Sequence, residues 1–196
     1  MASHDGLVNI MSQLKLLAVT FLKIVNDLRL LSCGPRAGLS ELQLPANEPG
    51  SSIMPGKINP TQCEAMAMVC TQIIGMDTSV SIAGSGGHLQ MNVYKPLIGY
   101  NILKSINLIQ NACKSCREHM IEGIQPNKEK IKQYLDNSLM LVTALAPSIG
   151  YEKASKIAQL AHKKNLSLKQ ACSQLNYIDQ EEFDNLINPK SMIGGN

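Results

Sequence analysis

The chain has 196 residues, of which 44% are apolar and 17% are charged, and its formal net charge is +3. This length suffices for one large domain or two small ones with a buried core, and the apolar fraction excludes a disordered chain. The small net charge argues against a nucleic-acid-binding protein, because such binding needs clustered Lys and Arg. Only 4% of the residues are aromatic, which favours helices over a β-sandwich. We therefore expect an all-α protein.

The first predicted helix runs from about residue 7 to residue 31. Apolar residues recur there at alternating steps of three and four, at Leu7, Ile10, Leu14, Leu17, Phe21, Ile24, Leu28 and Leu31. Further apolar residues lie on its other faces, which indicates a helix surrounded by other helices in a bundle. Because this helix begins within a few residues of Met1, we expect the chain to be part of a longer protein.

A segment rich in Gly and Pro, residues 34–59, follows this helix. A connection of this length is uncommon in a compact domain and is often functional. Lys57 and Asn59 stand at its end, directly before a second helix that we expect Asn59 to cap. A cation, an amide donor and the positive end of a helix dipole together suit an anionic substrate such as a carboxylate. An ordinary loop with a solvated lysine is the alternative.

The second predicted helix is nearly uncharged, since Asp77 is the one formally charged residue between Ala65 and Tyr94. Polar residues interrupt this segment, which argues against a membrane span of about 20 apolar residues. A small monomer can hardly bury such a helix, so we expect oligomerisation. The glycine-rich residues 84–87 are not a phosphate loop, because no strand precedes them.

A third long helix begins at Lys95 and ends near Gly123. Shorter and more charged helices follow, at about 128–136, 151–164, 168–175 and 180–187, and Ser167 and Asp179 have the features of helix caps. We predict a partial helical-bundle domain at 1–124 and a small helical carboxy-terminal domain at 125–196. No segment requires a β-strand, although the sequence of residues 140–150 is also compatible with a short pair of strands.

The six cysteines are expected to be reduced and mostly buried. A chain of this size needs no disulfides, and its first residues lack the basic start and apolar run of a signal peptide. The most metal-like spacing, Cys113-x-x-Cys116-x-x-His119, lies in a helical run without a fourth ligand. We therefore expect no metal site.

Residues 50–60 read Gly-Ser-Ser-Ile-Met-Pro-Gly-Lys-Ile-Asn-Pro. They resemble the signature G-S-S-x-M-P-x-K-x-N-P of the fumarase/aspartase superfamily at every fixed position. Gly56 and the continuation Thr-Gln-Cys-Glu-Ala at 61–65 are similar to class II fumarate hydratases rather than to aspartases. The similarity continues through residues 92–96 and the terminal stretch. It covers essentially the whole chain, but only the carboxy-terminal part of the family's polypeptide.

The resemblance implies a hydro-lyase of the tricarboxylic acid cycle that interconverts fumarate and L-malate through an aci-carboxylate intermediate, without a cofactor. It implies that Ser51 is the general base and that Lys57 and Asn59 hold a substrate carboxylate. Glu64 would orient a histidine supplied by another segment of the family's polypeptide. Ser52 is a further substrate-binding candidate, with hydrogen bonding inside the loop as its alternative role.

The resemblance also implies a homotetramer whose active sites each combine segments from three subunits. The family's catalytic-histidine segment does not match any part of this chain, so we expect the chain alone to be inactive. We expect neither nucleic acid nor membrane as a partner, and a location in the cytoplasm, with the mitochondrial matrix as the alternative. An aspartate ammonia-lyase and a non-catalytic helical relative, of the kind found among lens proteins, are the alternative functions.

Overall fold

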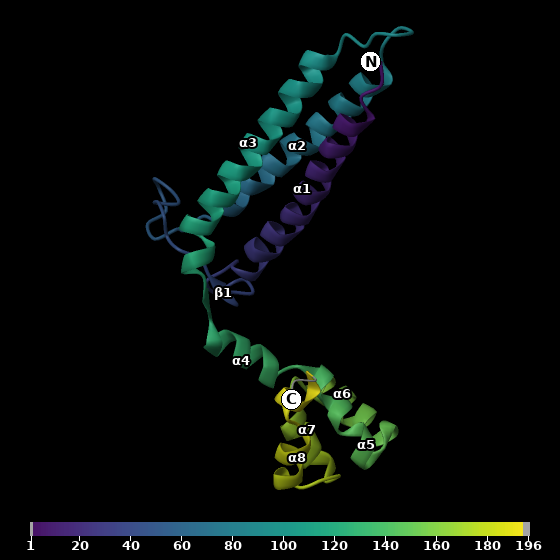
Figure 1. Cartoon of the computed structure of the whole chain (residues 1–196). Helices are drawn as coiled ribbons and strands as arrows, with labels where there is room; N and C mark the ends of the chain where they lie inside the picture. Colours follow the sequence, from purple (N-terminus) through teal and green to yellow (C-terminus); the bar gives the residue numbers. More distant parts are fainter. Residues whose placement is uncertain (1, 194–196) are drawn as a thin grey trace. The chain divides into compact units, whose positions relative to one another are not determined.

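The computed structural model describes residues 2–193, and helices dominate it (Figure 1). The chain forms two compact units, Met1–Asn127 and Lys128–Asn196. The predicted all-α class is confirmed.

Three long helices build the first unit: α1 (Asp5–Leu31), α2 (Thr61–Ser85) and α3 (Lys95–His119). They lie side by side and alternate in direction, with α2 packed against both neighbours (Figure 1). A single 3-10 turn, η1 (Ile121–Gly123), follows α3. The predicted third helix therefore ends at His119, and the residues near Gly123 form this separate turn.

The core of the first unit consists of apolar side chains at seven-residue intervals. On α1 the buried positions are Met11, Ala18 and Val25, and on α2 and α3 the same spacing holds for Met66, Ile73, Val80, Ile102, Ile109 and Cys116. This repeat is typical of helices that pack with a slight supercoil. The apolar stripe predicted for α1 is only partly used, because Leu7, Ile10, Leu17 and Ile24 remain more than a third exposed.

One charged group lies inside this core. Asp77 is nearly buried, with a side chain 5% exposed, and Lys15 from α1 donates to its carboxylate at 2.6 Å. Ser12 donates to the second carboxylate oxygen at 3.4 Å. The pair explains how α2 accommodates its one buried charge, and it fixes the register of α1 against α2.

Replacing Lys15 by methionine should destabilise the chain more than replacing Asp77 by asparagine. Lys15→Met leaves a buried carboxylate with only a long hydrogen bond, which costs about 1–3 kcal/mol. Asp77→Asn removes the buried charge and frees Lys15, which is 43% exposed, to turn toward water. Urea unfolding of the two variants, followed by circular dichroism, measures the difference. Equal losses, or a larger loss in Asp77→Asn, would contradict this reading.

Two short strands tie the connection after α1 to the far end of α3. β1 (Leu42–Gln43) pairs antiparallel with β2 (Gln125–Pro126), so that Leu42 faces Pro126. Asn127 adds a backbone hydrogen bond to Glu41 at 2.8 Å. The residues 140–150, which the sequence left open for a strand pair, instead form η2 (Leu139–Ala144) and α5 (Ala146–Ile149).

The second unit is a cluster of short helices. It contains α4 (Lys128–Asp136), α6 (Tyr151–Lys164), α7 (Leu168–Leu175), α8 (Gln180–Leu186) and α9 (Pro189–Met192). Among the described residues, its core, which includes buried Leu145, Ile157 and Phe183, is built by residues between Leu139 and Ile187, so α4 and α9 contribute nothing to it. The predicted helices at 128–136, 151–164 and 168–175 match these bounds, and α8 ends one residue early. Both predicted caps are confirmed: Ser167 accepts from the backbone of Gln170, and Asp179 accepts from that of Glu182 at 2.7 Å.

All six cysteines are free thiols, and four of them are buried. Burial, the largest cause, raises the pKa of Cys63 to about 11, with the neighbouring Cys116 adding to the shift. Within residues 2–193, no cluster of three or more His, Cys, Asp or Glu side chains is arranged to hold a metal ion. By length and hydropathy alone, α1 and α2 would suffice to cross a membrane, a test that core helices of soluble proteins also pass.

Candidate active site

The signature loop, residues 50–59, is closed by its own backbone. Gly50 donates to the carbonyl of Lys57 at 2.9 Å, and Lys57 donates to the carbonyl of Met54 at 3.3 Å. The side-chain amide of Asn59 donates to the carbonyl of Gly50 at 2.6 Å. Three hydrogen bonds therefore hold the loop in a defined turn directly before α2. Gly50 takes part in two of them, and Ser51 is the next residue along the chain.

Ser51 is oriented as a hydrogen-bond acceptor. Its Oγ accepts from the backbone N–H groups of Ile53 and Met54, each at 3.2 Å. Donors that point at a hydroxyl oxygen favour its ionised form, because they stabilise the negative charge. Such an environment is what a serine needs in order to act as a base or nucleophile. Ser52 is exposed, and its side chain makes no hydrogen bond within the described part of the chain.

Lys57 supplies the positive charge of the loop. The loop surrounds a solvent-open hollow of about 500 Å³, whose lining includes Glu48, Gly50, Ser51, Met54 and Lys57. Lys57 is exposed and has no ion pair among residues 2–193. Its ammonium group is therefore available to an anion that enters the hollow beside Ser51.

Asn59 does not cap α2, contrary to the sequence prediction. The helix begins at Thr61, and Pro60 occupies the capping position without a side-chain hydrogen bond. The Asn59 amide is instead engaged with Gly50. The side-chain amide nitrogen carries two hydrogens, so one donor remains for a ligand after this contact.

Glu64 lies one turn into α2 and forms an ion pair that the sequence did not predict. Arg29, in the last turn of α1, donates to Glu64 Oε1 at 3.0 Å. Two features of the sequence could have pointed to Arg29. It is a basic residue near the end of a predicted helix, and it follows apolar Val25 by four residues. Neither signal identifies a partner 35 positions away.

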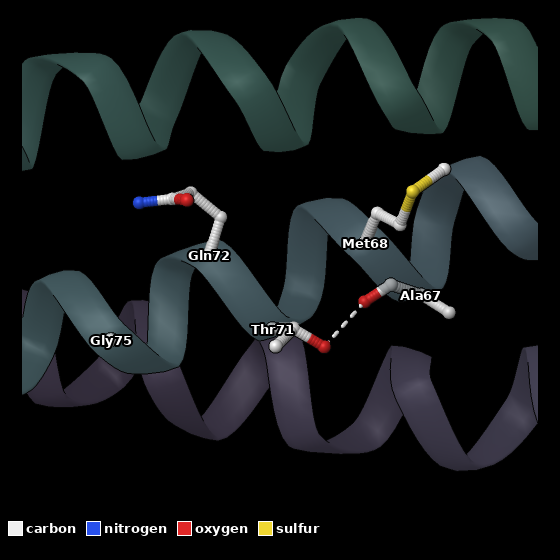
Figure 2. Close-up of a pocket in the computed structure, with 5 residues that line it drawn as sticks. All are labelled: Ala67, Met68, Thr71, Gln72 and Gly75. Atoms are coloured by element: carbon white, nitrogen blue, oxygen red, sulfur yellow. Dashed lines mark hydrogen bonds between the residues drawn. The ribbon is translucent and has the colours of Figure 1, made fainter.

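A second hollow, of about 350 Å³, lies along the middle of α2 (Figure 2). Thr71 there donates its hydroxyl to the carbonyl of Ala67 at 2.9 Å, so this polar group is already used inside the helix. The other lining residues are Met68, Gln72 and Gly75. None of these lining residues is charged, so this surface lacks a cation for an anionic substrate and an acid or base for proton transfer. The signature loop is the better candidate site.

Comparison with known proteins shows which family the chain resembles. One family model, described as lyase, matches residues 1–75, and another, described as the Fumarase C C-terminus, matches residues 141–194. The chain is 69% identical over 194 residues to the class II fumarate hydratase of Prochlorococcus marinus strain SARG, and 54% identical over 193 residues to that of Rickettsia prowazekii. The chain is similar over nearly its whole length to class II fumarate hydratases. Nearly all of this chain takes part in these matches, 99% and 98%, but it spans only 42% of either relative.

Solved structures agree with this similarity. A crystal structure of class II fumarase from Schistosoma mansoni superposes with a TM-score of 0.91 at 45% identity, covering 98% of this chain and 40% of that one. A fumarate lyase:delta crystallin from Brucella melitensis, crystallised with cobalt, gives a TM-score of 0.93 at 40% identity, covering 97% and 41%. The helical framework of this chain is therefore shared with these two crystallised proteins.

The two glycines of the loop should respond differently to substitution. A Cβ on Gly50 would lie 2.3 Å from the Lys57 carbonyl oxygen, so Gly50→Ala must open the turn. Gly56 has a φ of +77° and open space around it, so Gly56→Ala strains only its own backbone, by about 1–2 kcal/mol. We expect trypsin to cleave after Lys57 several-fold faster in Gly50→Ala, and less so in Gly56→Ala. The reverse order would show that the Gly50–Lys57 contact does not hold the loop.

Proposed function

We propose that the protein carrying this chain is a fumarate hydratase that interconverts fumarate and L-malate. The observation that carries the proposal is the closed loop in which Ser51 Oγ accepts two amide hydrogen bonds while Lys57 lines the same hollow. An activated hydroxyl next to a cation is suited to removing a proton from carbon next to a carboxylate. The names and high identities of the relatives support the same reaction.

In the dehydration direction, ionised Ser51 takes a proton from the carbon next to one carboxylate of L-malate. The electron pair of the broken C–H bond moves into that carboxylate and gives a dianionic aci-carboxylate. Lys57, the free donor of Asn59 and the N-terminal end of α2 offset this charge, which is the main requirement for the step. We further propose that Ser52, whose side chain makes no hydrogen bond within the described residues, donates one to the substrate.

The second step breaks the C–O bond on the neighbouring carbon. The electron pair of the aci-carboxylate forms the double bond of fumarate, and the hydroxyl leaves as water after it gains a proton. We assign Glu64 to this side of the reaction, where it orients a proton donor supplied by another segment of the enzyme. Ser51 then returns its proton to solvent, and the enzyme is ready for another turnover.

The exposed apolar surface of the first unit supports a homotetramer with shared active sites. Large apolar side chains remain 40–68% exposed on all three long helices, among them Leu16, Leu30, Met68, Ile82, Tyr100 and Leu103. A surface of this kind is typical of a subunit interface. Light scattering on the isolated chain should give four times the mass of one chain. A stable monomer at micromolar concentration would contradict the assembly.

The experiment that tests the function uses a chimera, in which this chain replaces the matching part of the relative from Prochlorococcus marinus strain SARG. The chimera should form malate from fumarate and should not release ammonia from aspartate. Turnover of aspartate alone would favour an ammonia-lyase. A folded tetramer without either activity would favour a non-catalytic structural relative. We also propose a cytoplasmic location, which the bacterial relatives support.

A further inference from the structure

The ion pair between Arg29 and Glu64 joins the end of α1 to the start of α2. Arg29 lies four residues after buried Val25, so it shares the face of α1 that packs against α2. Glu64 follows buried Cys63 in the first turn of α2. Both charges also act on Cys63, because Arg29 lowers the pKa of that thiol and Glu64 raises it, although burial is the larger cause of its shift. The pair thus occupies a defined place at the helix junction.

Stability alone does not account for this pair. The Glu64 side chain is 38% exposed and that of Arg29 is 55% exposed. Exposed ion pairs contribute little to the free energy of unfolding, because water competes for both partners. The signs do match the helix dipoles, with a carboxylate at the start of α2 and a cation at the end of α1. The dipoles of both helices therefore favour Glu64 at the start of α2 and Arg29 at the end of α1.

Only one oxygen of the Glu64 carboxylate is used by the ion pair. Arg29 contacts Oε1, and Oε2 has no hydrogen-bond partner among residues 2–193. A carboxylate can accept hydrogen bonds at both oxygens. Held at Oε1, Glu64 keeps Oε2 available to one further donor in a fixed direction.

We propose that Arg29 is a positioning residue for Glu64, holding its carboxylate through Oε1 so that Oε2 orients the proton donor of the second reaction step. This inference rests on the proposed function. Arg29 itself touches neither substrate nor the reacting atoms. Its contribution is geometric, since a small misplacement of a group that orients another can lower a rate by about 100-fold.

The test uses the chimera with Arg29→Met, Arg29→Lys, Glu64→Gln and the double variant Arg29→Met/Glu64→Gln. The matched control is Arg117→Met, which removes another arginine from the last turn of a helix, where it pairs with Glu118 and Glu122. We expect Arg29→Met to lower kcat roughly 10- to 100-fold with KM within about twofold. Arg29→Lys should recover most of the rate, because a single N–H donor suffices for the Oε1 contact. Arg117→Met should stay within twofold of the unsubstituted chimera.

The double variant decides between positioning and an independent effect. If Arg29 acts through Glu64, adding Arg29→Met to Glu64→Gln causes little further loss. Losses that multiply, or an unchanged kcat in Arg29→Met, would overturn the inference while leaving the proposed function intact. An unsubstituted chimera without fumarate hydration would instead overturn the proposed function, and this inference with it. If Arg29→Met does not fold, Arg29→Gln removes the same charge and is read in the same way.

Discussion

Replacing Ser51 by alanine in the chimera should lower kcat for L-malate dehydration by about 10²- to 10⁴-fold, the usual effect of removing a general base. The substitution deletes the oxygen that accepts from the Ile53 and Met54 amides. It leaves Lys57 in place, so affinity for a dicarboxylate inhibitor such as succinate should change much less than the rate. Steady-state kinetics and inhibitor titration separate the two effects.

Ser52→Ala is the matched control for this prediction. Ser52 is the neighbouring hydroxyl in the same loop, but its side chain makes no hydrogen bond within the described residues. Its removal should therefore change kcat by much less than the removal of Ser51. Near-normal turnover in Ser51→Ala together with a large loss in Ser52→Ala would show that the base is the other serine.

Replacing Lys57 by methionine should weaken binding of the same inhibitor by roughly 10- to 100-fold. This range corresponds to the loss of one charge-assisted hydrogen bond, worth about 1.5–3 kcal/mol. Lys57→Met keeps most of the length of the side chain and removes its charge beside the hollow. Isothermal titration of the chimera with succinate measures the change.

Lys114→Met serves as the control for Lys57→Met, because Lys114 is a lysine on α3 outside the loop. Its substitution should leave inhibitor affinity unchanged. Equal weakening in both variants would mean that the inhibitor responds to the overall charge of the protein rather than to a contact with Lys57.

The helices could be predicted from the sequence because their signals are short-range. The predicted bounds of α6 and α7 match the structure, and the Ser167 and Asp179 caps each act within three residues. The same reasoning failed at the start of α2. Asn59 has the residue type and place of a cap, but its amide is taken by the carbonyl of Gly50, nine residues earlier. A competing partner outside the helix is invisible to a local rule.

Contacts between distant segments could not be predicted for a related reason. β1 and β2 are two residues long, too short for any alternation of apolar and polar residues, and they pair across a long stretch of the chain. Arg29 meets Glu64 only because α1 and α2 pack in one register. In the candidate site, the signature motif predicted Ser51 and Lys57 as functional residues. It could not predict that two backbone amides donate to Ser51 Oγ, because these contacts depend on how the loop folds.

Comparing the isolated chain with the chimera in a fumarate hydration assay tests most directly whether this chain supplies one part of a shared active site. The chain brings Ser51 and Lys57 but spans only 42% of its Prochlorococcus marinus relative. Incomplete positioning of substrate can remove about 7–11 kcal/mol of catalysis. We therefore expect the chimera to form malate and the isolated chain to form none above background. Malate formation by the isolated chain at a rate near that of the chimera would contradict the account.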